Sequence, residues 1–377
     1  MAVERYEDRV LAGLRRFPDV EAPNLHAVDA TDRLLLDTAA PTLGELPPGT
    51  LVVLGDRYGA LTLGAASRFG CARIRCHTDA LTGEQARALN AERFGLTGSY
   101  SDFALTGELF TGARVVLVQA PKGLDELAEW VGLLARHADS AVRVFLGGRV
   151  KYLTPAMNDV LGLAFENVTA GLARQKSRVI EAAGLRADPE PPSFPQREWH
   201  ADPGLWVCAH GGAFAGTRID IGTRRLLAVL SELPHVDSAI DLGCGTGVLA
   251  VALARRGIRV LASDSSAAAV RSCSATAEAN GLTELIAVQR DDALSSVASS
   301  SVPLIVCNPP FHLGGAVHAG AAVKLFESAA RVLAPGGQLW TVFNSHLGYS
   351  SVLRRLIGPS RVVHRDLKFT VAASIKA

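Results

Sequence analysis

The sequence has few cysteines for its length and no strong excess of charge. Its 377 residues include 6 cysteines, which form no CxxC pair and no Cys/His cluster with the spacing of a zinc site. We therefore expect reduced, buried thiols, and neither a disulfide framework nor a metal site. The formal net charge is +1, which permits an RNA partner without requiring one.

The sequence also lacks long apolar runs. No stretch of about 18 uninterrupted apolar residues is present, so no membrane-spanning segment is expected. The first eight residues, Met1 to Asp8, are charged and lack the apolar core of a secretory signal, so the expected location is the cytoplasm. Hydrophobic residues nevertheless make up 48% of the chain, which is enough for a large core, and the length suggests two domains.

A proline-rich segment divides the chain. Four prolines fall within the seven residues 189–195, a density that neither a helix interior nor a central strand tolerates. We predict a first domain over 1–188, a linker over 189–203 and a second domain over 204–377. Residues 1–195 carry 21 Lys and Arg against 24 Asp and Glu, a net charge of −3, and the remainder carries 17 against 13, a net charge of +4.

Strand and helix patterns alternate in the second half. Strands are expected at 238–240, 259–262, 286–289, 304–307 and 337–343, and helices at 248–256 and 267–280. Alternation of this kind predicts a mostly parallel, doubly wound sheet that binds ligands at the carboxyl ends of its strands.

The first half repeats this scheme, which indicates an internal duplication. A helix predicted over 82–93 ends at Gly95, as the second-half helix ends at Gly281, and the same offset of 186 residues pairs Gly59 with Gly245. The same offset pairs Asp241 with Gly55, Gly243 with Arg57, Gly247 with Leu61 and Asp264 with Thr78, and after a short insertion Asn308 aligns with Ala120. All of these pairs differ in chemistry. We therefore predict that the first domain is degenerate and binds no cofactor.

A glycine-rich turn follows the strand that ends near Asp241. Gly243, Gly245 and Gly247 have the spacing GxGxG and allow the backbone to approach a ligand closely. A dinucleotide fingerprint has the spacing GxGxxG and faces a pyrophosphate. An acid at the strand end suits the positively charged S-adenosylmethionine better, and the loop spacing argues against an NAD-dependent oxidoreductase.

Further carboxylates follow the next two strands. Asp264 lies 17 residues after Gly247, where it can accept hydrogen bonds from both ribose hydroxyls, although it can equally cap the following helix. Asp291 and Asp292 follow the third strand and are candidates for the adenine amino group, with Asp292 favoured because it precedes Ala293. The alternative is that both are ordinary loop acids.

The segment Asn308-Pro309-Pro310-Phe311 is the most specific motif. The prolines remove two N–H donors and stiffen the turn, so the Asn308 amide oxygen and a main-chain carbonyl can accept from one NH2 group. Phe311 offers a face on which a planar base can stack. These features predict a methyl acceptor that is a planar exocyclic amine; the alternative is a proline turn that caps a buried strand.

Other residues near this motif are weaker candidates for substrate contacts. His312 either contacts the substrate or is a solvated loop side chain, and Phe214 and Asp220 either close over the site or serve packing and a turn. Lys368 belongs to a basic C-terminal region that either follows phosphates or is a solvated face.

The motifs together resemble the class I rRNA guanine-N2 methyltransferases of small-subunit type C and large-subunit type G. The resemblance rests on Asp241-Leu-Gly-Cys-Gly-Thr-Gly, on Asp264 and on Asn308-Pro-Pro-Phe-His, and extends to 214–227 and to Lys368-Phe369. It implies two tandem Rossmann-like methyltransferase domains, of which the first is degenerate, and transfer from S-adenosylmethionine to N2 of a guanosine in rRNA or a ribosomal subunit particle.

The predicted site residues have catalytic, cofactor-binding and substrate-binding roles. The predicted catalytic residues are Asn308, Pro309, Pro310 and Phe311; the predicted cofactor-binding residues are Asp241, Gly243, Cys244, Gly245, Gly247, Asp264, Ser265, Asp291, Asp292 and Asn308; and the substrate-binding candidates are Phe214, Asp220, His312 and Lys368. A protein glutamine-N5 or adenine-N6 methyltransferase is one alternative, and a non-catalytic RNA-binding assembly factor is another. The sequence leaves open whether the protein is a monomer or a homodimer.

Overall fold

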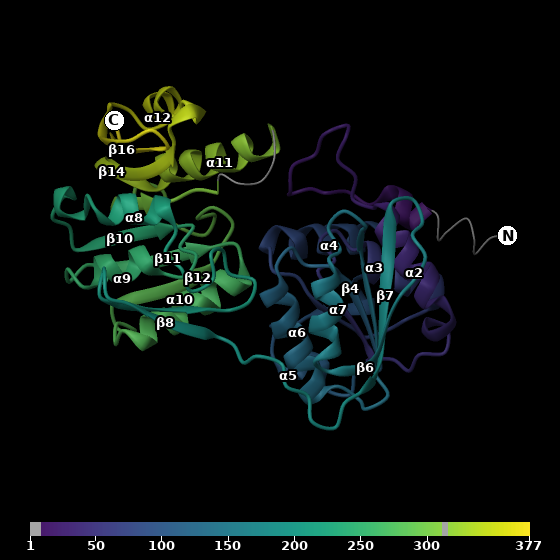
Figure 1. The fold of residues 1–377 in the computed structure, drawn as a ribbon. Helices are drawn as coiled ribbons and strands as arrows, with labels where there is room; N and C mark the ends of the chain where they lie inside the picture. Colours follow the sequence, from purple (N-terminus) through teal and green to yellow (C-terminus); the bar gives the residue numbers. More distant parts are fainter. Residues whose placement is uncertain (1–8, 311–315) are drawn as a thin grey trace. The chain divides into compact units, whose positions relative to one another are not determined.

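The chain forms two compact α/β units. The computed structural model describes residues 9–310 and 316–377, and contacts between Cα atoms divide the chain into Met1–Phe194 and Pro195–Ala377. In each unit, helices cover both faces of a central sheet (Figure 1).

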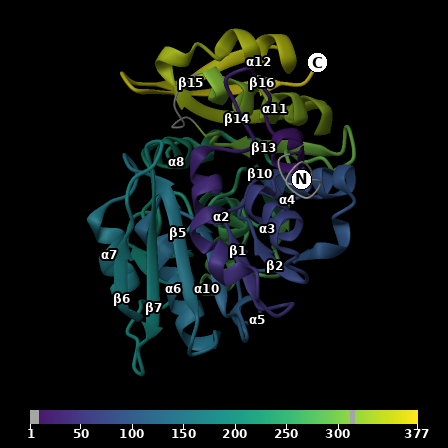
Figure 2. The ribbon, with the colours of Figure 1, turned by 90° about the vertical axis from the view of Figure 1, so that its right-hand side faces the viewer.

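The first unit contains a seven-stranded sheet with the strand order β3-β2-β1-β4-β5-β7-β6. Its elements are α2 (Ala30–Leu43), β1 (Leu51–Leu54), α3 (Ala60–Phe69), β2 (Ile74–His77), α4 (Leu81–Phe94), β3 (Tyr100–Asp102), α5 (Gly107–Phe110), β4 (Val115–Gln119), α6 (Leu124–His137), β5 (Arg143–Arg149), α7 (Pro155–Gly162), β6 (Phe165–Ala170) and β7 (Ser177–Leu185). The strands are parallel except β7, which is antiparallel to both β5 and β6 (Figure 2).

The second unit contains a sheet of the same size with the order β12-β11-β10-β13-β14-β16-β15, and a separate hairpin of β8 and β9. Its elements are β8 (Gln196–His200), β9 (Leu205–Ala209), α8 (Ile221–Leu227), β10 (Ser238–Leu242), α9 (Val248–Ala254), β11 (Arg259–Asp264), α10 (Ala267–Ala279), β12 (Ile286–Arg290), β13 (Val302–Cys307), α11 (Ala316–Val332), β14 (Leu333–Asn344), α12 (Ser350–Leu356), β15 (Ser360–Arg365) and β16 (Phe369–Ile375).

The two sheets have one topology. Counted along each chain half, the strand order is the same in both, and in both the last strand lies antiparallel between its two neighbours. This agreement confirms the predicted fold class of two mostly parallel, doubly wound sheets, and it supports the duplication.

Buried strands in the second unit supply one core on each face of the sheet. Along β13, Leu304 and Val306 pack into the core beneath α8, α9 and α10, whereas Ile305 and Cys307 pack into the core beneath α11 and α12. Side chains alternate between the faces of a strand, so a strand buried on both sides is a continuous apolar run. Apolar runs of this kind are the basis on which the strands were predicted from the sequence.

The residue pairing predicted between the two glycine loops is wrong by two positions. In the structure Gly55 corresponds to Gly243: both follow the first strand, with φ of 75° and 74°, and their N–H groups donate to the carbonyls of His77 and Ser263. Gly59 corresponds to Gly247, because each is the left-handed residue that begins the following helix.

The corrected pairing changes which first-unit residues stand opposite the motif. Arg57 corresponds to Gly245 and Val53 to Asp241, whereas Leu61 corresponds to Leu249 and Gly55 is a true counterpart of a loop glycine. The first unit has two more residues between Gly59 and Thr78 than the second has between Gly247 and Asp264, so the offset of 186 holds from β2 onward but not at the glycine loop.

The same correction applies at the other motif. Leu54 is in register with Val118, and Leu242 with Cys307, so the residue opposite Asn308 is Gln119 and the predicted partner Ala120 is wrong. Leu54 and Leu242 are likewise in register with His77 and Ser263, which places Thr78 opposite Asp264 in agreement with the prediction.

Several elements were not predicted. The segment assigned to the linker, 189–203, includes β8, whose cross-strand pair Trp199 and Trp206 has ring centroids 5.3 Å apart. The antiparallel strands β6, β7, β15 and β16 were also missed.

Candidate active site

The glycine loop between β10 and α9 is held in a left-handed conformation at three positions. Gly243, Gly245 and Gly247 have φ of 74°, 52° and 80°. At Gly247 a Cβ would lie 2.6 Å from the Cys273 Sγ, so the helix packs too closely for a side chain. At Gly245 a Cβ would meet nothing within 4 Å. The loop therefore leaves open space at Gly245, where a ligand can approach the backbone.

The Asp241 carboxylate is buried at the end of β10, with 1% of the residue exposed. Its Oδ2 accepts from the Ala250 N–H at 2.9 Å, and its Oδ1 is a buried atom with no hydrogen-bond partner among the residues that the structure describes. Burial, opposed by the Ala250 bond and reinforced by the charge of Asp264, raises the pKa of Asp241 to about 7. A buried acceptor without a donor marks a place for a positively charged group.

Asp264 ends β11 and faces the glycine loop. Its Oδ2 accepts from the Gly245 N–H at 3.1 Å, and its Oδ1 from the Ser266 N–H at 2.9 Å. The alternative prediction that Asp264 caps the next helix is wrong, because Ser266 is the N-cap of α10 and its Oγ accepts from the Ala269 N–H. Ser265 lies between these two residues, and its carbonyl accepts from the Arg290 side chain at 3.4 Å.

Cys244 is placed for structure more than for ligand contact. Its N–H donates to the Ser263 carbonyl at 3.1 Å, and its carbonyl accepts from the Gly247 N–H at 2.8 Å. The thiol is buried, and its contact with Cys273 together with burial raises the pKa well above the usual range for cysteine. This thiol therefore stays protonated and unreactive.

The two acids after β12 differ in their surroundings. Asp291 is buried and accepts from the backbone N–H and the hydroxyl of both Ser295 and Ser296. These bonds outweigh burial and lower its pKa. Asp292 forms an ion pair with Lys324 of α11, with Nζ–O distances of 2.7 and 2.6 Å. Asp291 thus organises its own turn, and Asp292 is the acid of the two that a ligand can reach if Lys324 moves.

Asn308 directly follows β13 and is tied to α8 by its side chain. The Nδ2 donates to Asp220 Oδ2 at 2.7 Å and to Thr223 Oγ1 at 3.0 Å. The Asn308 carbonyl lies 4.0 Å from the Cβ position of Gly243, so the motif and the glycine loop are neighbours at one edge of the sheet. Pro309 is buried and Pro310 is exposed. Phe311 and His312, which the sequence also nominated, lie outside the described residues.

Asp220 begins α8 as its N-cap. Its Oδ1 accepts from the Gly222 N–H at 2.9 Å, and its Oδ2 from the Thr223 N–H at 3.0 Å and the Thr223 hydroxyl at 2.7 Å. The predicted substrate contact of Asp220 thus has a second interpretation, since its carboxylate also serves the helix and Asn308. From the run Asp-Ile-Gly-Thr at 220–223 the sequence nominated only Asp220, and the structure adds Thr223 and Gly222 as neighbours of Asn308.

Phe214 and Lys368 lie on loops that lead to the site. Phe214 is 64% exposed and lies between β9 and α8. Lys368 lies in the turn between β15 and β16, which Asp366 organises by accepting from the backbone N–H groups of Lys368 and Phe369. An ion pair of 2.8 Å between Arg225 and Asp366 joins this turn to α8.

The first unit fills the corresponding place with its own side chains. Arg87 of α4 is fully buried, and its Nη1 donates to the Asp56 carbonyl at 2.6 Å and to Thr78 Oγ1 at 2.8 Å. Its Nη2 forms an ion pair with Asp102. Thr78 is the counterpart of Asp264, so a guanidinium lies where the second unit has its ribose-binding candidate.

Replacing Arg87 by alanine should destabilise the first unit by roughly 2 kcal/mol or more, because it empties a fully buried site and removes one donor each from the Asp56 carbonyl and from Thr78 Oγ1. Urea unfolding of the full chain measures the loss. The exposed Arg93, which donates to the Gly13 carbonyl at 3.0 Å, is the matched control, and Arg93→Ala should cost less than about 1 kcal/mol. Equal effects of the two variants would contradict a structural role for Arg87.

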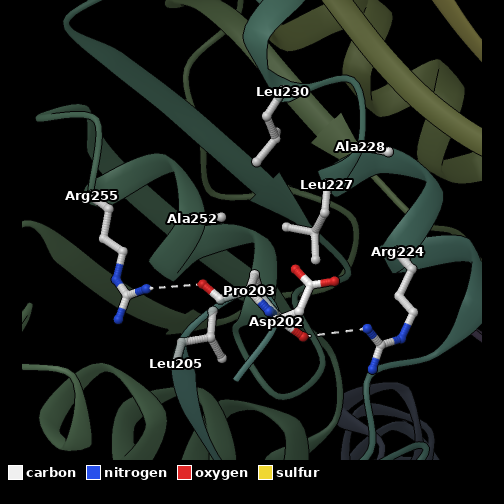
Figure 3. A pocket seen from close by; sticks show the side chains of 9 residues that line it. All are labelled: Asp202, Pro203, Leu205, Arg224, Leu227, Ala228, Leu230, Ala252 and Arg255. Carbon is white, nitrogen blue, oxygen red and sulfur yellow. Dashed lines mark hydrogen bonds between the residues drawn. The ribbon is translucent and has the colours of Figure 1, made fainter. Parts of the chain in front are cut away.

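A cavity of about 370 Å³ lies elsewhere on the second unit. Leu205, Leu227 and Ala252 are among the apolar residues that line it, and Arg224 and Arg255 hold the carbonyls of Asp202 and Pro203 at its rim (Figure 3). None of the predicted site residues lines this cavity, so we do not include it in the active site.

Two further features of the described part of the chain concern metal ligands and membrane-spanning helices. Residues 9–310 and 316–377 contain no group of three or more His, Cys, Asp or Glu side chains arranged to hold a metal ion. None of the helices in these ranges is long and apolar enough to cross a membrane.

Comparison with known proteins covers both units. A family model of the methyltransferase small domain matches residues 204–373, and a model of the RLMG N-terminal domain matches residues 6–186. A ribosomal RNA large subunit methyltransferase G of Streptomyces avermitilis is 37% identical, with 96% of each chain covered. One of Shewanella amazonensis is 33% identical, again with 96% of each chain covered.

A solved structure has the same two-unit fold. The 16S rRNA N2 methyltransferase RsmC of T. thermophilus, determined in complex with AdoMet and guanosine, superimposes with a TM-score of 0.74 at 22% identity, covering 93% of this chain and 92% of that one. At this identity the likeness concerns the fold. The sequence relatives carry the assignment, and by them the chain belongs to the family of the ribosomal RNA large subunit methyltransferases G.

Proposed function

We propose that the second unit transfers the methyl group of S-adenosylmethionine to the exocyclic N2 amine of a guanosine in large-subunit rRNA. The observation that carries the proposal is the Asn308 side chain: its NH2 group is occupied by Asp220 and Thr223, which leaves the amide oxygen as an acceptor, while the main-chain carbonyl of Asn308 lies near the glycine loop. The names of the relatives support the rRNA substrate and its subunit.

The residues around the loop suit this cofactor. The unpartnered Oδ1 of Asp241 and its neighbour Asp264 make the edge of the sheet electronegative, which favours a sulfonium and an ammonium group over a pyrophosphate. Open space at Gly245 allows the cofactor to approach the protein backbone. We assign the ribose hydroxyls to Asp264 and the adenine amine to Asp292, whose ion pair with Lys324 would have to open. When bound, the cofactor supplies the electrophilic methyl group.

Cofactor binding should weaken as the pH falls below about 7. An ammonium beside Asp241 favours the ionised carboxylate, whose pKa is raised to about 7 in the protein alone, so below that pH a proton must leave before the ion pair forms. Titration calorimetry at pH 6.0 should therefore give a larger Kd than at pH 7.5. Asp241→Asn should bind more weakly at pH 7.5 but lose this dependence; an unchanged pH dependence in the variant would argue against the pairing.

The protein's part in the reaction is orientation of the acceptor amine. The Asn308 amide oxygen and the carbonyl of Pro309 can each accept one N–H of the amine, which directs the nitrogen lone pair toward the methyl group. Positioning of this kind is worth about 7–11 kcal/mol in favourable cases. Because the amine can lose its proton after transfer, no general base is required.

The alternatives are less well supported. A protein glutamine methyltransferase would use the same motif, but we expected a small helical first domain in that case, and the first unit is a seven-stranded α/β unit. A non-catalytic assembly factor would have no need of an open loop at Gly245 or an oriented Asn308. The first unit is proposed to bind no cofactor and to stabilise the fold or position RNA. A ribosomal substrate also implies that the enzyme acts in the cytoplasm.

Transfer of a labelled methyl group tests the acceptor class. Purified enzyme is incubated with S-adenosylmethionine labelled in the methyl group and with ribosomal subunits from cells that lack the gene. We expect label in material that ribonuclease releases and protease does not. Label that only protease releases would instead support a protein acceptor, and no transfer to any fraction would support the non-catalytic alternative.

A further inference from the structure

The Asn308 amide is held by a closed set of hydrogen bonds. Both of its N–H groups have an acceptor, one on Asp220 at 2.7 Å and one on Thr223 at 3.0 Å. The Thr223 hydroxyl donates to Asp220, so its lone pairs face Asn308. None of the hydrogen bonds recorded among residues 9–310 and 316–377 uses the Asn308 Oδ1, which is left to accept from a ligand.

An amide side chain can turn by 180° about its last bond and exchange its oxygen for its nitrogen. In the turned state Asn308 would present N–H donors to an acceptor amine that is itself a donor, and the two would repel. The turned state would also place the amide oxygen against the Asp220 carboxylate. Charged acceptors make the stronger hydrogen bonds, so Asp220 is the group that most strongly selects one orientation.

We infer that Asp220, assisted by Thr223, is a positioning residue that locks the Asn308 amide with its oxygen toward the acceptor amine. This inference rests on the proposed function, since it explains how Asn308 is prepared for that amine. Asp220 is placed beside Asn308 by its role as N-cap of α8. Gly222 leaves room for the contact, because a Cβ there would lie 3.0 Å from the Asn308 Oδ1.

The first unit contains a comparable hydrogen bond between a strand end and a helix start, although we propose no catalytic role for that unit. Gln119, the counterpart of Asn308, donates through Nε2 to Asp32, which lies three residues after Asp29, the N-cap of α2. Thr223 lies three residues after the cap Asp220 in the same way. A strand end tied to a helix start is therefore part of the duplicated fold, and a test must separate orientation of the amide from structural support.

Asp220→Asn separates orientation of the Asn308 amide from structural support of the helix, because asparagine caps a helix as well as aspartate does. Asparagine offers one oxygen where Asp220 offers two, so it cannot serve both the Gly222 N–H and the three donors that share Oδ2, namely the Thr223 N–H, the Thr223 hydroxyl and Asn308 Nδ2. The Asn308 amide then loses its charged acceptor, which weakens the preference against the turned amide. We expect kcat to fall roughly 10- to 100-fold, with the Kd for S-adenosylmethionine and the Tm close to wild type.

Exchange of the two side chains supplies the decisive readout. In Asp220→Asn/Asn308→Asp the hydrogen bond is restored with its direction reversed, and the second oxygen of the new carboxylate again faces the acceptor amine. We expect the double variant to recover at least tenfold over Asp220→Asn. Asn308→Asp alone should be poorly active at neutral pH, because two carboxylates then face each other, and should gain activity as the pH falls.

Two results would overturn the inference: Asp220→Asn with kcat within twofold of wild type, or a folded double variant no more active than Asp220→Asn. Asp32→Asn in the first unit is the matched control and should leave kcat unchanged. Asn308→Ala keeps the two proposals distinguishable. If Asn308→Ala is inactive while Asp220→Asn is fully active, only the positioning role fails, whereas full activity of Asn308→Ala would reject the amine-binding function itself.

Discussion

Asn308→Ala is expected to lower kcat roughly 100- to 1,000-fold, which corresponds to about 2.7–4 kcal/mol of lost transition-state stabilisation. The variant removes the oxygen that orients the acceptor amine. It leaves Asp241, Asp264 and the glycine loop unchanged, so the Kd for S-adenosylmethionine should stay within about threefold of wild type. Single-turnover methyl transfer measures the first quantity and titration calorimetry the second.

The duplicated fold supplies the control for this experiment. Gln119 occupies the same position at the end of β4 that Asn308 occupies after β13, and Gln119→Ala should leave both kcat and Kd unchanged. Full activity in Asn308→Ala, or an equal loss in both variants, would show that the amide does not hold the amine.

Gly245→Arg is expected to weaken S-adenosylmethionine binding roughly 100-fold or more, a loss of about 2.7 kcal/mol. The guanidinium would enter the space that is open at Gly245 and lie near the Asp264 carboxylate. The first unit has Arg57 at the corresponding position, but Arg57 is not among the residues with positive φ, so the two loops differ in backbone conformation there. The left-handed φ of 52° at Gly245 should add a cost in stability of about 1–2 kcal/mol.

Gly245→Ala separates the backbone strain from the filling of the site. It carries the same left-handed conformation, but a Cβ at this position meets nothing within 4 Å, so alanine should cost stability without abolishing cofactor binding. If alanine and arginine weakened binding equally, strain in the loop would explain the loss. If Gly245→Arg bound the cofactor normally, the loop would not be its site.

The sequence was sufficient to predict β10 to β14 of the second unit and the motif positions, whereas β2, β3 and β5 of the first unit were missed. Strands buried on both faces are continuous apolar runs, and β10 and β13 lead into polar residues whose side chains the fold brings to one edge. The hairpin of β8 and β9 and the antiparallel pair of β15 and β16 were missed. β15 and β8 are largely exposed, so no apolar run marks them.

The loop alignment failed for a different reason. A constant offset assumes that no residue is inserted between matched elements, whereas the first unit has two more residues between Gly59 and Gly95 than the second has between Gly247 and Gly281. The constant offset then pairs Gly59 with Gly245, whereas its true counterpart is Gly247, and it pairs Gly55 with Asp241 instead of Gly243. Only the φ angles and the register of β1 with β2 show which glycines correspond.

The link between Asp220 and Asn308 could not be predicted from spacing. The two residues are 88 positions apart, and no local pattern states that the start of α8 meets the end of β13. The sequence left open whether the run Asp-Ile-Gly-Thr closes over the site or serves packing and a turn, and the structure makes Asp220 the N-cap of α8. Asp220 meets Asn308 because α8 packs on the same core as α9, and this packing is a property of the tertiary fold.

The central claim is that the second unit methylates guanine N2 in large-subunit rRNA with Asn308 holding the amine. Large subunits from cells without the gene are incubated with S-adenosylmethionine and either wild-type enzyme or Asn308→Ala, and the nucleosides of the purified rRNA are identified by mass spectrometry. The account predicts one additional N2-methylguanosine per rRNA with the wild type and little or none with the variant. A different methylated nucleoside, or the same yield from both enzymes, would contradict it.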